Sequence, residues 1–139
     1  MFLRCIRAQI FEQKGKRMDE KTFLTVAKLA YRRAGSSDYS FEDVWGVLQY
    51  YAETYRLIFE KSLPAINVDQ AADYIRAMPS VEDCYGRTRD LTPEDYRLVI
   101  DQHFATRYGP SCNYSLQHFF SGAIRTNRVH ELRGQLGDY

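Results

Sequence analysis

The strongest constraint on the fold of this 139-residue chain is a recurring pattern in which a helix-capping residue precedes apolar side chains spaced three and four positions apart. The chain contains one Trp, 11 Tyr and eight Phe, and most of these rings lie on such stripes. Apolar residues at this spacing form one face of an α-helix, which must be buried against another element. The pattern therefore predicts an all-α fold, a single compact bundle of five to six helices.

Capping residues mark the first two helices. Asp19 predicts a helix that continues to about residue 34. Ser40 predicts the longest helix, which ends near Lys61 because Pro64 disfavours helical geometry in the residue before it. We expect this second helix to form the centre of the core.

The third and fourth helices have equally clear starts. Asn67 begins a capping box and predicts a helix that stops at Pro79. Thr92 is followed by Pro93 and two acids, which predicts a fourth helix to about residue 106.

The rest of the chain is less regular. Residues 79–91 show no usable periodicity, so we expect a surface loop there and no strand in the protein. Ser115 or Asn113 caps a predicted fifth helix that continues toward Leu132 unless Gly122 interrupts it.

The charge distribution divides the chain into three parts. Residues 1–17 hold five of the 19 basic side chains and one of the 18 acidic ones. We predict a basic, amphipathic N-terminal segment (1–17), a helical domain (18–133) and a frayed tail (134–139).

The N-terminal segment has two interpretations. Either Met18 rather than Met1 is the biological start, or the segment belongs to the protein and forms a short helix with Phe2, Ile6 and Ile10 on one side. Such a helix is expected to pack against the domain, since the stretch is short for a helix that lies on a membrane surface.

Cysteine usage indicates the compartment. Cys5, Cys84 and Cys112 are far apart and form no CxxC pair. An odd number of cysteines without a signal peptide favours a reducing environment, and the apolar runs are short. We therefore expect a cytoplasmic protein without a membrane partner.

Enzymatic functions have weak support. Cys112 could pair with His118 or His103 as nucleophile and base, but a buried thiol beside a core histidine explains the same residues. Paired spacings typical of zinc ligands and glycine-rich phosphate loops are both absent from the sequence. We expect a non-enzymatic protein that uses no metal and no cofactor.

A basic stretch near the C-terminus suggests DNA as one possible partner. If the fifth helix is continuous, it places several polar side chains on one face, next to its buried one. Arg and Asn can contact base edges, and other polar groups can hold phosphate. The candidate nucleic-acid-binding residues are Arg107, His118, Arg125, Asn127 and Arg128.

Surface tyrosines suggest a protein partner instead. Tyr50 and Tyr51 are adjacent on the second helix and cannot both point inward. Tyrosine is enriched in protein contacts because it buries a large area at low entropic cost. The candidate protein-interaction residues are Tyr50, Tyr51, Tyr74 and Tyr85.

One segment carries a resemblance to known proteins. Residues Asn113 to Arg125 read Asn-Tyr-x-x-x-His-Phe-Phe-Ser-Gly-x-Ile-Arg. With this pattern, and more loosely from Tyr39 through Phe104, the chain resembles small uncharacterised bacterial proteins carried on phage-like and integrative elements of anaerobes. The resemblance implies a helical domain and a role in mobile-element biology, and it transfers no activity and no functional residue.

Two functions follow from these observations. The first is a non-catalytic helical module that binds a protein partner or a second copy through an aromatic face. The alternative is a DNA-associated accessory protein of a mobile element that uses the basic C-terminal helix. Salt-dependent binding to duplex DNA distinguishes them.

Overall fold

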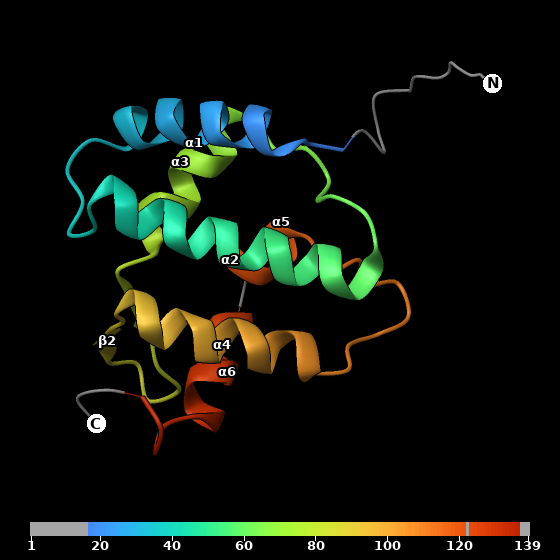
Figure 1. Ribbon diagram of the computed structural model, residues 1–139. Helices are drawn as coiled ribbons and strands as arrows, with labels where there is room; N and C mark the ends of the chain where they lie inside the picture. Colours follow the sequence, from blue (N-terminus) through green and yellow to red (C-terminus); the bar gives the residue numbers. More distant parts are fainter. Residues whose placement is uncertain (1–16, 122, 137–139) are drawn as a thin grey trace.

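The computed structural model describes residues 17–121 and 123–136, and this part of the chain is mostly helical (Figure 1). The elements in chain order are α1 (Glu20–Ala34), α2 (Phe41–Phe59), α3 (Val68–Ala77), β1 (Ser80–Glu82), β2 (Thr88–Asp90), α4 (Pro93–Ala105), α5 (Leu116–Phe120) and α6 (Ile124–Glu131). The helical prediction is confirmed for the bulk of the fold. It is wrong as a purely all-α description, because a small two-stranded sheet is present.

The four capping residues begin the helices that the sequence predicts. Asp19 accepts a hydrogen bond from the backbone of α1, and Ser40, Asn67 and Thr92 each take part in a reciprocal capping box. The long helix α2 ends at Phe59, slightly earlier than predicted, where the next residue adopts a left-handed conformation.

The prediction of a plain surface loop over residues 79–91 is wrong. β1 and β2 pair antiparallel, with Val81 opposite Arg89. The turn between them is held by Asp83, whose carboxylate accepts hydrogen bonds from two backbone N–H groups. Each strand has three residues, and Val81 alone of the six is buried, so the alternating pattern that marks a strand never develops in the sequence.

Of the two alternatives for the fifth helix, the structure has the interrupted one. α5 ends at Phe120, Ser121 is extended, and α6 begins at Ile124. The interruption falls where the sequence carries Gly122, which lies outside the described residues.

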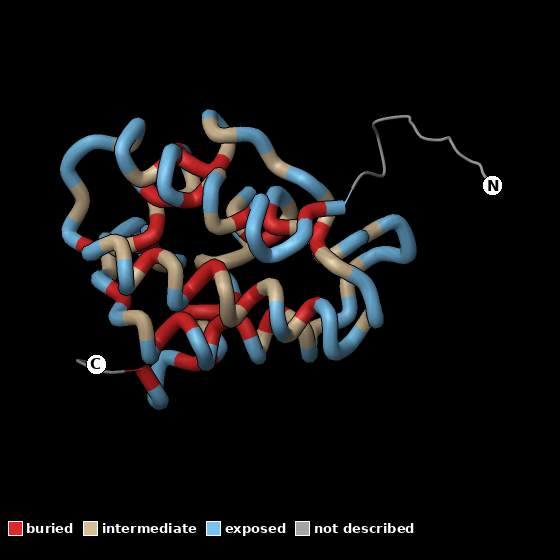
Figure 2. Tube along the Cα trace, turned by 45° about the horizontal axis from the view of Figure 1, so that its top comes forward, coloured by how far each residue is buried: buried red, intermediate tan, exposed pale blue. Residues whose placement is uncertain are grey.

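Helix α2 lies between α1 on one side and α4 on the other, and α6 packs against the far side of α4 (Figure 1). Figure 2 shows the buried residues on the facing sides of these helices. The largest fully buried side chains include Tyr51 from α2, Tyr96 from α4 and Phe119 from α5. Burial of these aromatic side chains therefore joins α2 to α4 and α5.

The two predicted terminal segments are described only in part. Of residues 1–17, Arg17 alone is described, and its backbone bridges to Pro64. A short N-terminal helix would lie outside the described residues. In the predicted tail, Leu136 is buried against the domain, whereas residues 134 and 135 are exposed.

The capping box at the start of α4 can be tested directly. The Thr92 Oγ1 accepts a hydrogen bond from the Asp95 backbone N–H at 3.0 Å. We expect Thr92→Ala to lower the free energy of unfolding by about 1 kcal/mol in urea denaturation. Ser111→Ala, on an exposed loop, is the matched control, and an equal effect of both substitutions would contradict this assignment.

Candidate functional site

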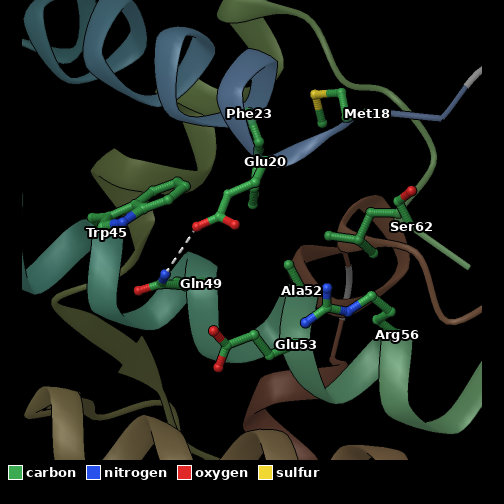
Figure 3. Close-up of a pocket in the computed structure, with 10 residues that line it drawn as sticks. Met18, Glu20, Phe23, Trp45, Gln49, Ala52, Glu53, Arg56 and Ser62 are labelled. Carbon is green, nitrogen blue, oxygen red and sulfur yellow. Dashed lines mark hydrogen bonds between the residues drawn. The ribbon is translucent and has the colours of Figure 1, made fainter.

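A small pocket opens between the start of α1, the middle of α2 and the segment that follows α2 (Figure 3). Its volume is about 70 Å³. Its apolar lining residues are Met18, Phe23, Trp45, Ala52 and Leu63, and its polar ones are Glu20, Gln49, Glu53, Arg56 and Ser62. The pocket therefore has an apolar interior and a polar, charged rim.

Backbone pairing and a ring contact join the segments that line the pocket. The Met18 N–H donates to the Leu63 carbonyl at 3.0 Å, which joins the chain before α1 to the chain after α2. The ring centroids of Phe23 and Trp45 are 5.4 Å apart, so these two side chains pack α1 against α2. On the rim, the Gln49 amide donates to the Glu20 carboxylate at 3.3 Å (Figure 3).

The size of the pocket limits what it can bind. Pockets for cofactors and drug-sized ligands usually have volumes of about 300–1,000 Å³. A 70 Å³ pocket lined by aromatic and aliphatic groups fits one apolar side chain. Such a recess with a charged rim is typical of the anchor positions in protein interfaces.

The solvent-facing side of α2 next to the pocket carries an unusual apolar residue. Leu57 exposes 80% of its surface, more than the other large apolar side chains in the described part of the chain. Glu53 and Arg56, which line the pocket, are also exposed and lie next to it on the helix. We call the pocket together with Gln49, Ala52, Glu53, Arg56 and Leu57 the α2 face.

A second group of polar residues lies inside the protein, around His103. The Tyr51 hydroxyl donates to the Tyr114 carbonyl at 2.6 Å, so it accepts from Nε2–H of His103 at 2.9 Å. Nδ1 of the neutral imidazole then accepts from the Tyr108 hydroxyl at 2.9 Å. That hydroxyl oxygen accepts in turn from Arg128, so the order of donors is determined along the whole chain.

The electrostatics of this cluster favour neutral groups. Burial, aided by the nearby His118 and Arg128, lowers the pKa of His103 to about 3. Burial also raises the pKa of Tyr51. Burial therefore keeps the imidazole of His103 and the phenol of Tyr51 neutral near pH 7, and their hydrogen bonds are made inside the protein.

Both described cysteines lie beside a histidine. The Cys112 sulfur is 3.4 Å from Nδ1 of His118 and accepts from the Tyr114 backbone N–H, and the exposed Cys84 sulfur is 3.1 Å from Nδ1 of His130. Of the two bases considered for Cys112, the structure brings His118 into contact. In many enzymes a third group orients the base of such a pair, and no hydrogen bond among the described residues joins a carboxylate to either imidazole. In the described ranges, 17–121 and 123–136, no group of three or more potential ligands could hold a metal ion.

The residues predicted to bind DNA are not gathered on one polar face. Arg128 is buried and makes two hydrogen bonds to the Glu131 carboxylate, and Arg125 donates to the Ala77 carbonyl and the Tyr96 hydroxyl. The half-buried side chain of His118 contacts Cys112, whereas Arg107 and Asn127 are exposed. The single polar face required one continuous helix, and the break between α5 and α6 separates His118 from Arg125, Asn127 and Arg128.

The four tyrosines also lie in different places. Tyr51 is buried in the core, and Tyr74 stacks on Phe120 at 4.7 Å. Tyr85 is exposed in the hairpin turn. Tyr50 is half-buried at the junction of α2 and α4, where its hydroxyl donates to Asp101 at 2.6 Å.

Sequence reasoning missed the α2 face. Tyr50 lies seven residues, or two turns, before Leu57 and therefore on the same side of α2. The signal available was Leu57 itself, an apolar residue outside the buried stripe of its helix. The pocket had no such signal, because three separate segments form it.

The chain matches no protein-family model, no curated protein and no solved structure with which it was compared. The resemblance to proteins of mobile elements therefore stays a prediction. Among the described residues, no helix is both long and apolar enough to span a bilayer.

The lowered pKa of His103 predicts a specific pH dependence of stability. The ordinary value is 6.5 and the folded value is about 3, so the unfolded chain binds the proton more tightly over this range. Stability contributed by neutral His103 is present above about pH 6.5 and is lost as the pH falls toward 3, by about 2 kcal/mol between pH 7 and pH 5.

The measurement is the free energy of unfolding in urea at pH 7 and pH 5, for wild type and for His103→Phe. The variant leaves hydrogen-bond partners unpaired and should be less stable at pH 7, but its loss between the two pH values should be smaller by about 2 kcal/mol. Equal losses in the two proteins would show that His103 is not held neutral.

Proposed function

We propose that this protein is a non-catalytic protein-interaction module that binds its partner through the α2 face. The observation that carries the proposal is a small apolar pocket, open at the surface, beside a leucine that is 80% exposed. Burying a leucine side chain stabilises a complex by about 1.5–3 kcal/mol. A partner that covers Leu57 and places an apolar side chain in the pocket gains from both features.

The charged rim supplies orientation. Glu53 and Arg56 have opposite charges and lie one turn apart on α2, so a partner must match both charges to approach the pocket. Tyr50 borders this surface, and its ring is fixed by the bond to Asp101 and by the Arg97 guanidinium 5.0 Å from the ring centroid. A fixed ring loses little entropy on binding.

The alternative, a DNA-associated protein, receives less support. Arg125 and Arg128 have internal partners, which leaves Arg107 and Asn127 as the exposed members of the predicted set. The cysteine usage favours the cytoplasm as the place where the module acts.

Filling the pocket tests the proposal. Peptides that bind the full chain are selected from a random library, and their affinity is measured for wild type and for Ala52→Leu, which places extra methyl groups in the pocket. We expect selected peptides to carry an apolar anchor and to bind the variant at least about tenfold more weakly, since one buried side chain contributes this much or more.

The matched control is Leu98→Ala on α4, which alters an exposed apolar residue away from the pocket. It should leave the affinity unchanged, and unfolding curves should show that both variants are folded. If no peptide is selected, or if the selected peptides bind Ala52→Leu as tightly as wild type, the proposal is wrong.

A further inference from the structure

Basic side chains lie in a line along the exposed side of α1, and the line ends at a hollow lined by aromatic rings. From these two features together we infer that α1 carries a second binding surface, for single-stranded nucleic acid. This surface is separate from the α2 face and does not depend on the proposed function. α1 lies at one edge of the fold, with α2 and α3 on its inner side, so within the described part of the chain its outer side faces solvent (Figure 1).

Three cations form the line. Lys21, Lys28 and Arg32 are exposed and lie seven and four residues apart, which places them within about 40° of one another around the helix. Among the described residues, none of these three side chains makes a hydrogen bond or an ion pair. Arg33 differs, because it is paired with Asp69. The three charges are therefore available to a chain of anions.

The hollow at the end of the line is shallow and has a volume of about 360 Å³. Its lining residues are Lys28, Tyr31, Arg32, Gly35 and Phe41. The two aromatic rings are half-buried, and their centroids are 5.6 Å apart at an interplanar angle of 72°. The Tyr31 hydroxyl donates to the Tyr39 carbonyl at 2.8 Å, which fixes the Tyr31 ring. The hollow thus presents fixed aromatic surface next to two positive charges. We call the hollow together with Lys21 the α1 face.

This combination matches the chemistry of a single strand. Proteins that bind single-stranded nucleic acid hold the phosphates on cations and stack the bases on aromatic side chains. In a duplex each base is covered by its neighbours, so the rings of Tyr31 and Phe41 have no base to stack on. An acidic peptide would satisfy the cations and leave the rings unused.

The charge of the whole chain favours the same end. Residues 1–33 hold nine of the 19 basic side chains and three of the 18 acidic ones, and the other 106 residues hold ten basic and 15 acidic groups. No acidic residue of the described chain lines the hollow. Attraction of a polyanion is therefore directed toward α1.

Fluorescence anisotropy tests this inference, with the full chain and labelled oligothymidylate or oligouridylate of about 15 nucleotides, close to the upper end of the site sizes of such proteins. We expect both strands to bind, since neither charge nor stacking reads the 2′-hydroxyl. Three cations on a single strand give a slope of about −2 in log K against log salt, so affinity should fall about 20-fold between about 50 and 200 mM salt.

Two variants separate charge from stacking. Lys28→Ala with Arg32→Ala should weaken binding at least about tenfold at low salt and make the slope shallower by about 1.4, because two phosphate contacts are lost. Phe41→Leu stays apolar but lacks the ring, so it should weaken binding about fivefold or more at an unchanged slope. A structural defect alone would not divide the two effects in this way.

The matched control is Arg107→Ala with Arg133→Ala, which removes the same charge from exposed positions after α4 and α6. It should change the affinity by less than about twofold, because these charges lie away from the bound strand. Urea unfolding curves should show that every variant is folded.

Several results would overturn the inference. One is the absence of binding to either strand at low salt, and another is a control that loses as much affinity as Lys28→Ala with Arg32→Ala. Wild-type affinity in folded Phe41→Leu would show that no base stacks in the hollow. Equal competition by polyglutamate, or tighter binding to a duplex of the same length, would show that the α1 face attracts negative charge without selecting a single strand.

Discussion

The structure depends on a chain of buried hydrogen bonds that runs from Tyr51 through His103 and Tyr108 to Arg128. Buried polar groups without partners cost about 1–3 kcal/mol each, so such a chain is stable only when every member is satisfied. Here each donor has an acceptor, and the chain ends on the exposed carboxylate of Glu131. Tyr51 is in α2, His103 in α4, Tyr108 in the loop after α4, and Arg128 in α6. One continuous set of hydrogen bonds therefore joins these three helices.

Aromatic packing makes this arrangement specific. The ring of Phe119 lies 5.2 Å from that of Tyr51 and 4.9 Å from that of His103. The rings exclude water from the imidazole, which strengthens its hydrogen bonds and keeps it neutral. Because a phenol is longer than a leucine and must end on a polar partner, the tyrosines allow fewer alternative packings than an aliphatic core would.

The helix boundaries could be predicted from sequence because they depend on neighbouring residues. Asn67 and Gln70 cap each other within one turn, as do Thr92 and Asp95, so no tertiary information is needed. The hairpin lacks such a local signal, whereas the break before α6 falls at Gly122, the residue that the sequence offered as a possible interruption.

Much of the candidate site depends on residues far apart in the sequence. Arg128 looks like a surface residue in the sequence, and it is buried because Tyr108, from another segment, and Glu131 both accept its hydrogen bonds. The pocket is formed by Met18, α2 and Leu63, which approach one another only in the folded chain. Tyr50 was the one predicted interaction residue that borders the α2 face, because helical spacing alone places it near Leu57.

The exposure of Leu57 is a consequence of the core and not of loose packing. Tyr51 and Tyr55 are both buried, and the Tyr51 hydroxyl is bonded to His103, so the rotation of α2 about its axis is fixed. Leu57 lies more than a quarter of a turn from the direction shared by these two tyrosines, at about 100° per residue. Turning α2 to bury Leu57 would break the hydrogen bond of Tyr51 and expose aromatic surface, a loss larger than the gain from one leucine. Within one copy, therefore, the apolar surface of Leu57 cannot be covered by a small adjustment of the fold, and contact with another molecule is the remaining way to remove it from water.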